Sequence, residues 1–110
     1  MKKSTKNHVQ EFENLLTSEK KGDKYKLRLF IAGMNAKSRT AIENLNRILD
    51  ENLKEQYELE IIDIYKDIEP AKQNHIVATP TLLKDLPLPI RKFVGDMSDE
   101  DKILLGLKPK

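Results

Sequence analysis

Hydrophobic and polar positions predict alternating strands and helices along most of the chain. Residues 25–32 alternate and become continuously apolar from Leu29, as is typical of a buried central strand. Gly33 ends this strand, and Asn35 or Ser38 can cap the helix that follows. The helix carries one apolar stripe and ends around residues 52–54; its members are Ala41, Ile42, Leu45, Ile48 and Leu49. Residues 57–65 form the next predicted strand, which completes a βαβ unit with parallel strands.

The second half of the chain predicts shorter elements. Residues 67–74 can form a short helix that tolerates Pro70 in its first turn. Residues 81–84 and 90–94 can pair as an antiparallel hairpin, because the prolines between them fall in the turn. A last helix can begin after Asp96 or Ser98 and bury Ile103, Leu104 and Leu107. The predicted order is βαβαββα, an α/β fold.

Several positions have the chemistry of structural turns. An apolar run meets Thr79-Pro80, where proline fixes its own φ and pushes Thr79 towards an extended conformation. Both a cis bond and an ordinary trans bond are open there. Gly33, Gly95 and Asp96 are the other expected turn positions.

Residues 1–24 form an extension before the domain predicted for residues 25–110. Its apolar residues Val9, Phe12, Leu15 and Leu16 have helical spacing, which predicts a short amphipathic helix over residues 8–19. Two interpretations remain open for this helix: it docks on its own domain or merely frays, or it contacts a partner or a second copy. The extension has six lysines and four acidic residues, so it holds the whole net charge of +2. The balanced domain argues against nucleic acid as the main partner.

Composition and motifs exclude most chemistry. Zero cysteines exclude disulfides, thiolate catalysis and cysteine metal sites. His8 and His75 are far apart, and the acidic residues 96–101 lack the spacing of a calcium loop, so we expect no metal, cofactor or enzyme activity. No apolar stretch reaches ~18 residues and no signal peptide is evident, which favours a cytoplasmic protein away from membranes. An interaction module is the remaining class.

The most specific stretches of the chain resemble one family. They are Ile31-Ala32-Gly33, Ile62-Asp63-Ile64, Ala78-Thr79-Pro80-Thr81-Leu82 and Ile103-Leu104-Leu105-Gly106-Leu107. Together with residues 91–98, they resemble the KaiB family of circadian-clock proteins and the related sensor domain of SasA-type kinases. The resemblance implies a thioredoxin-like fold in at least one state. Residues 34–38 then occupy the place of a Cys-x-x-Cys motif, so thiol redox activity is excluded.

The same resemblance implies partners and a binding surface. KaiB-like proteins bind the ring of the KaiC ATPase, capture KaiA and displace the SasA-type kinase. The family's basic surface residues map onto Lys84, Arg91 and Lys92. Two positions depart from the family pattern: Thr40 stands where relatives often carry arginine, and Glu60 where they carry a basic residue. These departures weaken the case for a clock-type partner, above all for a KaiA-like one, and leave room for a role outside a true oscillator, for instance in stress adaptation.

Alternatives remain for both fold and function. The family also has the order βαββααβ, in which the chain after about residue 65 refolds. Lys108, Pro109 and Lys110 suit the end of a helix, which favours the thioredoxin-like state here. The functional alternatives are a self-assembling stress-related protein, as a dimer or tetramer, and a free-standing relative of the SasA sensor domain.

Overall fold

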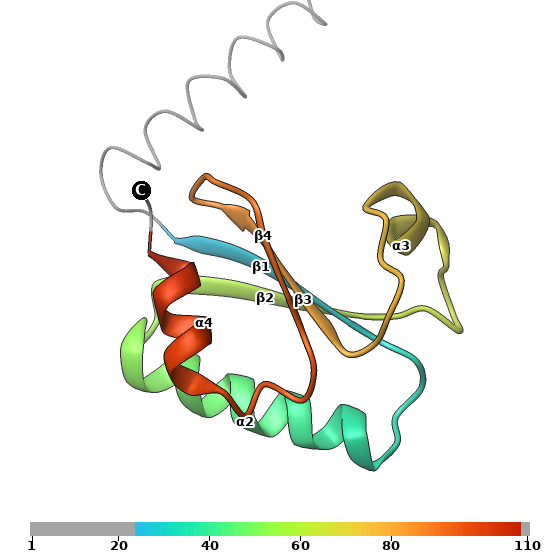
Figure 1. The fold of residues 1–110 in the computed structure, drawn as a ribbon, viewed down its shortest axis with the longest axis horizontal. Coiled ribbons are helices and arrows are strands. Elements are labelled where there is room, and N and C mark those ends of the chain that lie inside the picture. The colour runs from blue at the N-terminus through green and yellow to red at the C-terminus, as the bar shows by residue number, and fades with distance from the viewer. Residues whose placement is uncertain (1–23, 109–110) are drawn as a thin grey trace, which may run out of the picture.

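The computed structural model describes residues 24–108, and the predicted helix of the extension lies outside them. The described chain has the order βαβαββα, as predicted (Figure 1). Its elements are β1 (Tyr25–Ile31), α2 (Ala36–Asn52), β2 (Tyr57–Asp63), α3 (Glu69–Gln73), β3 (Thr81–Leu86), β4 (Arg91–Val94) and α4 (Glu100–Leu107).

The four strands form one mixed sheet in the order β2-β1-β3-β4. β1 and β2 are parallel with Leu29 opposite Ile61, and α2 connects them. β3 runs antiparallel to β1, with Leu29 opposite Leu82. β4 runs antiparallel to β3, so β2 and β4 are the two edge strands of the sheet.

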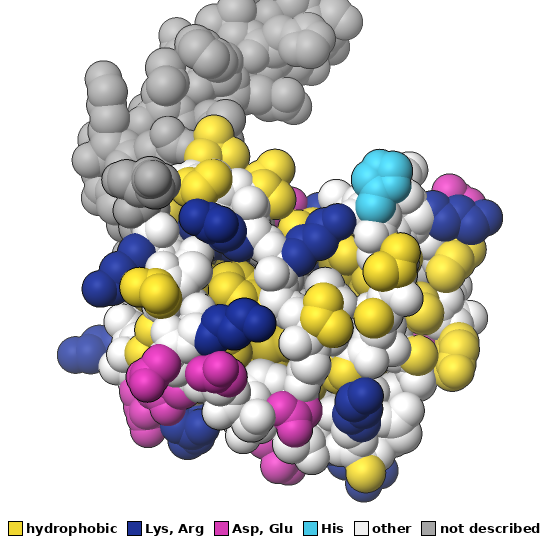
Figure 2. Space-filling model, viewed as in Figure 1, with side chains coloured by type: hydrophobic (Ala, Val, Ile, Leu, Met, Phe, Trp, Pro, Cys, Tyr) yellow, Lys and Arg dark blue, Asp and Glu magenta, His cyan; other side chains and the backbone are white. Residues whose placement is uncertain are grey.

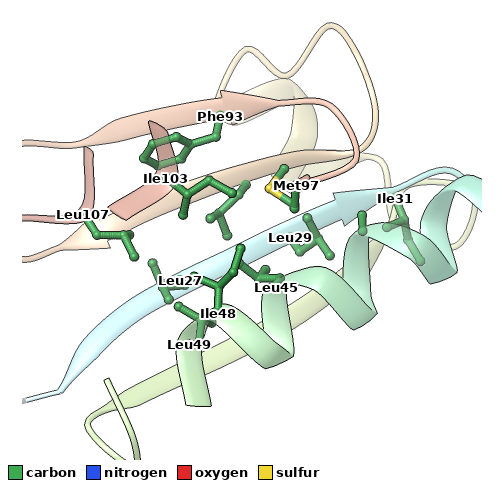
Figure 3. Close-up of a cluster of buried hydrophobic side chains, with 12 residues drawn as sticks. Leu27, Leu29, Ile31, Leu45, Ile48, Leu49, Phe93, Met97, Ile103 and Leu107 are labelled. Carbon is green, nitrogen blue, oxygen red and sulfur yellow. The ribbon is translucent and has the colours of Figure 1, made fainter. Parts of the chain in front are cut away.

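Helices cover the two faces of the sheet unequally. α2 and α4 lie on one face and the five-residue α3 on the other (Figure 1). The larger core lies between the sheet, α2 and α4 (Figure 3); its buried residues are Leu27, Leu29, Ile31, Ala41, Leu45, Ile48, Leu49, Leu82, Phe93, Met97, Ile103 and Leu107. A smaller cluster lies under α3 and consists of Phe30, Ile62, Ala71 and Leu83. The helix stripe predicted for residues 41–49 therefore faces the core, as amphipathic spacing requires.

The N-cap residue predicted for α2 is confirmed, and the one predicted for α4 is wrong. Asn35 is the N-cap of α2, and its Oδ1 accepts a hydrogen bond from the Ser38 backbone N–H at 2.9 Å. The expectation that Asp96 or Ser98 caps α4 is wrong, because Asp99 is the N-cap and accepts from the Lys102 N–H. Asp96 instead accepts from the Ser98 N–H within the turn. Hydrogen bonding from the Ser98 side chain and then from its backbone N–H lowers the pKa of Asp96.

No helix among residues 24–108 is long and apolar enough to span a bilayer.

Candidate partner-binding site

The turn between β1 and α2 is the place where a thioredoxin carries its thiols. Gly33 adopts φ +78° there and donates its N–H to Asp63 Oδ1 at 3.0 Å. A side chain at Gly33 would be strained by this φ and would lie 3.2 Å from the ring of Tyr65. Met34 and Asn35 follow in the turn, so it contains neither a nucleophile nor a redox couple.

Two of the expected turns meet at one end of the sheet. The Gly95 N–H donates to the Pro80 carbonyl oxygen at 3.0 Å, and Gly95 has φ +124°. The Thr79–Pro80 bond is cis. The Asp96 carbonyl oxygen accepts from Asn44 Nδ2 at 2.9 Å, which ties this end of the sheet to α2.

A charged cluster that sequence reasoning missed lies on the α3 side of the sheet. Arg28 donates to both carboxylate oxygens of Asp85, from Nε at 2.8 Å and from NH2 at 2.9 Å. The NH2 group also donates to Asn74 Oδ1 at 3.3 Å, so Arg28 links β1, β3 and the end of α3. The hydrogen bond to Asp85 raises the pKa of Arg28, and the nearby charge of Glu60 adds to this effect. Because its charges are paired, this cluster is better explained as a structural clamp than as a binding site.

The three predicted basic residues all lie on the hairpin of β3 and β4, with Lys84 and Arg91 on one face of the sheet and Lys92 on the other. Lys84 stands directly opposite Arg91, and Leu83 stands opposite Lys92. Successive side chains point to opposite faces of a strand, so Arg91 lies on the side of the buried Phe93, and Lys92 on the other. Like charges at opposite positions of an antiparallel pair destabilise a sheet. The Lys84–Arg91 pair therefore breaks a local folding rule, as functional sites often do.

Lys84 does not lie on the surface, which corrects the expectation of a solvent-exposed contact residue. Its side chain is 0% exposed, and its Nζ donates to the Leu107 carbonyl oxygen at 3.3 Å. α4 has no basic residue of its own in its last turn. Lys84 therefore supplies the positive charge that suits the negative end of this helix. Burial, and next the charge of Arg91, lower the pKa of Lys84.

Arg91 and Lys92 are exposed and have no ion pair with any residue in the range 24–108. The Lys92 Nζ makes one contact, to the His75 carbonyl oxygen at 3.4 Å. Exposed apolar side chains flank the two cations, with Ile90 59% and Val94 63% exposed. Figure 2 shows basic and hydrophobic side chains interspersed on this side of the molecule. A surface of this kind fits an acidic partner that also buries apolar area.

The two departures from the family pattern lie away from this hairpin. Thr40 and its neighbour Arg39 are exposed on α2. Glu60 is exposed on the edge strand β2, where a depression is lined by Glu60, Glu58, Lys26, Arg28 and Asp85. Most of these charges are paired, since Lys26 lies 3.5 Å from Glu58 and Arg28 holds Asp85. Within the described chain, no group of His, Cys, Asp and Glu is arranged to hold a metal ion.

Comparison with solved structures defines the class of fold. The N-terminal domain of Synechococcus elongatus SasA aligns with a TM-score of 0.66 and 20% identity, covering 77% of this chain and 80% of that one. The germline-specific thioredoxin Deadhead of Drosophila melanogaster aligns with a TM-score of 0.62 and 16% identity, covering 94% and 90%. The chain is therefore a thioredoxin-like α/β protein, as predicted, in which the thiol motif is missing.

Comparison with known sequences defines the family. A family model described as "KaiB domain" matches residues 28–109. Circadian clock protein KaiB3 of Synechocystis sp. is 47% identical over 81 residues, covering 74% of this chain and 79% of the relative. Circadian clock oscillator protein KaiB of Synechococcus elongatus is 43% identical over 83 residues, covering 76% and 81%. The chain belongs to the KaiB family, and its relatives are named as clock proteins and not as enzymes, which agrees with the prediction of a non-enzymatic protein.

Proposed function

We propose that this chain is a non-enzymatic regulator with a clock-type role, and that it binds a KaiC-like ATPase ring and modulates the phosphorylation or output of that ring. The observation that carries the proposal is the pair of exposed cations, Arg91 and Lys92, with no counter-charge among residues 24–108. The family assignment supports the identity of the partner, because the curated relatives are clock proteins.

Arg91 and Lys92 are the residues that we expect to face carboxylates of the ring. Charges at the rim of an interface mainly steer the encounter, so their loss lowers the association rate more than it raises the dissociation rate. Ile90 and Val94, on either side of these two residues along the strand, supply exposed apolar area. In the thioredoxin-like state, Lys84 supports the end of α4 through its hydrogen bond to the Leu107 carbonyl oxygen. Lys84 can contact the ring directly only after α4 moves away from it.

Charge reversal tests this assignment. The rate of association with the ATPase ring is measured in the presence of ATP for the wild-type chain, Arg91→Glu and Lys92→Glu. Lys66→Glu is the matched control, because Lys66 is an exposed lysine in the loop after β2. We expect about a tenfold slower association for each hairpin variant and a smaller effect at higher salt. Equal rates for hairpin and control variants would remove the hairpin from the interface.

The thioredoxin-like state is, in this proposal, the state that binds. A KaiB-like protein also has the order βαββααβ available to it, and two packings of one sequence can differ by only a few kcal/mol. We propose that the thioredoxin-like order is less disfavoured here than in a typical relative, in part because Lys84 supports the end of α4. Amide spectra of the chain at equilibrium test this idea. Signals of the alternative order alone, unchanged by substitution of Pro109, would contradict it.

We also propose relationships to two other kinds of clock protein, a SasA-type kinase and a KaiA-like protein. A SasA-type kinase would compete for the ring, because its N-terminal domain shares this fold. A KaiA-like protein is a weaker candidate, because Glu60 on the β2 edge carries the opposite charge to the family pattern.

Self-assembly is the second candidate function. The observation in its favour is the edge strand β4, which is paired on one side only and carries the exposed Val94. An open edge with apolar side chains can pair with a second copy. Light scattering of the chain alone, over a range of concentrations, separates this dimer or tetramer from a monomeric regulator.

A further inference from the structure

The turn between β3 and β4 is an exposed apolar patch with a basic strand directly after it. It consists of five consecutive apolar residues: Leu86, Pro87, Leu88, Pro89 and Ile90. Leu88 is 46% and Ile90 59% exposed, so the tip of the hairpin leaves much apolar area in water. Arg91 and Lys92 follow in the chain. We call residues 86–92 the hairpin patch.

The described chain begins beside this patch. Lys26 stands opposite Leu86 in the β1–β3 ladder, and neighbouring strands lie about 4.8 Å apart. Figure 1 shows the β3–β4 turn at the same end of the sheet as the start of β1 and the end of α4. The described chain therefore begins, at Lys24, next to the hairpin patch.

The segment of residues 8–19 has the composition that the patch requires. Its apolar residues Val9, Phe12, Leu15 and Leu16 have the spacing of one helix face. Its charged residues are Glu11, Glu13 and Glu19, with no lysine or arginine. The segment therefore complements Arg91 and Lys92, which have no ion pair among residues 24–108. The lysines of the extension lie on either side of this segment, at positions 2, 3, 6, 20, 21 and 24.

The connection is long enough to allow this contact and short enough to favour it. Seven residues separate Leu16 from Lys24, and an extended chain of that length spans up to about 25 Å. A short tether gives the segment a millimolar effective concentration at the patch, which a second copy at micromolar concentration does not match.

From these observations we infer that residues 8–19 pack on the hairpin patch of their own chain and mask Arg91 and Lys92 from the partner. The masking role rests on the proposed function, whereas the docking itself does not. Binding of the partner then requires the segment to leave. If the segment covers the patch in about four molecules of five, the apparent affinity for the partner falls about fivefold.

Substitutions within the full chain test the docking. The variant Phe12→Ser/Leu16→Ser removes two apolar residues of the segment, and the control Gln10→Ser/Asn14→Ser changes two polar residues of the same segment without changing its charge. The readout is the amide spectrum of residues 88–92 in each chain alone. We expect shifts in these signals for the apolar variant only, and no change on dilution of the wild-type chain. Identical spectra for both variants would overturn the docking, and wild-type signals that move on dilution would assign the patch to a second copy.

Binding to the ATPase ring with ATP tests the masking. We expect the apolar variant to bind about fivefold more tightly than the control variant. Equal binding of the two variants would overturn the masking role. If neither variant nor the wild-type chain binds the ring while the spectra show docking, the proposed function fails and the docking stands.

Discussion

The packing of α4 against β4 gives the sharpest prediction about stability, because one glycine makes it possible. Gly106 lies inside α4, and a Cβ there would be 2.4 Å from Cε2 and 2.6 Å from Cζ of Phe93. Ordinary contacts are longer by about 1 Å, so the buried Phe93 ring has to move. Overpacking of this kind costs about 1–3 kcal/mol, whereas alanine in place of glycine within a helix gains at most about 1 kcal/mol.

We therefore expect Gly106→Ala to lower the free energy of unfolding by about 1 kcal/mol, against the direction of helix propensity. For a domain of this size the midpoint of thermal unfolding falls by roughly 4–8 °C. The matched background is Phe93→Leu, because leucine removes the two close atoms and keeps the branch at Cδ2, which lies 3.7 Å from the new Cβ. In that background we expect Gly106→Ala to be neutral or stabilising.

The assay is urea unfolding followed by circular dichroism, since the chain has no tryptophan. The four chains of this double-mutant cycle should give a coupling energy of about 1–3 kcal/mol between the two positions. Equal stabilisation of the chain by Gly106→Ala in both backgrounds would show that a Cβ at this position does not clash with Phe93.

Three further predictions concern single contacts. Asn35→Ala should cost about 1 kcal/mol in the free energy of unfolding, because it removes the N-cap of α2; an unchanged urea midpoint would contradict this. Arg28→Gln should destabilise the chain more than Lys26→Gln, because it leaves the half-buried Asp85 without its two hydrogen bonds; equal losses would show that the clamp contributes little. The Tyr57 hydroxyl donates to Asp50 Oδ1 at 2.6 Å, and this bond raises its pKa to about 12. The folded pKa lies above the unfolded value of about 10, so the hydrogen bond stabilises the fold fully below pH ~10 and is lost as the pH rises through ~12. The difference in unfolding free energy between the wild-type chain and Tyr57→Phe should therefore shrink between these pH values. A constant difference would refute the hydrogen bond.

The order of elements could be predicted because it depends on local patterns. The apolar stripe of residues 41–49 has the spacing of one helix face, and the alternation that becomes a continuous apolar run from Leu29 is typical of a buried strand. The observed strands differ from the predicted ones mainly at their ends, where hydrogen bonding to neighbours decides the boundary; β3, for example, continues to Leu86.

The burial of Lys84 and the pairing of Arg28 depend on contacts between residues far apart in the chain, which the periodicity of the sequence cannot predict. Lys84 is buried because α4, more than 15 residues later in the chain, places its last carbonyl over it. The clamp joins Arg28 to Asp85, 57 positions apart. The sequence offers one signal for Lys84: it directly follows the apolar residues Leu82 and Leu83 in a predicted strand, and a buried lysine has to find a polar partner.

We propose above all that the chain binds a KaiC-like ATPase ring through Arg91 and Lys92. Its most direct test is size-exclusion chromatography with light scattering, on the full chain after long incubation with the ring and ATP. We expect a complex that co-elutes with the ring and is lost in the Arg91→Glu/Lys92→Glu variant, while Lys66→Glu still binds. A chain that never joins the ring, or a double variant that joins it as well as the wild type, would rule out this interface.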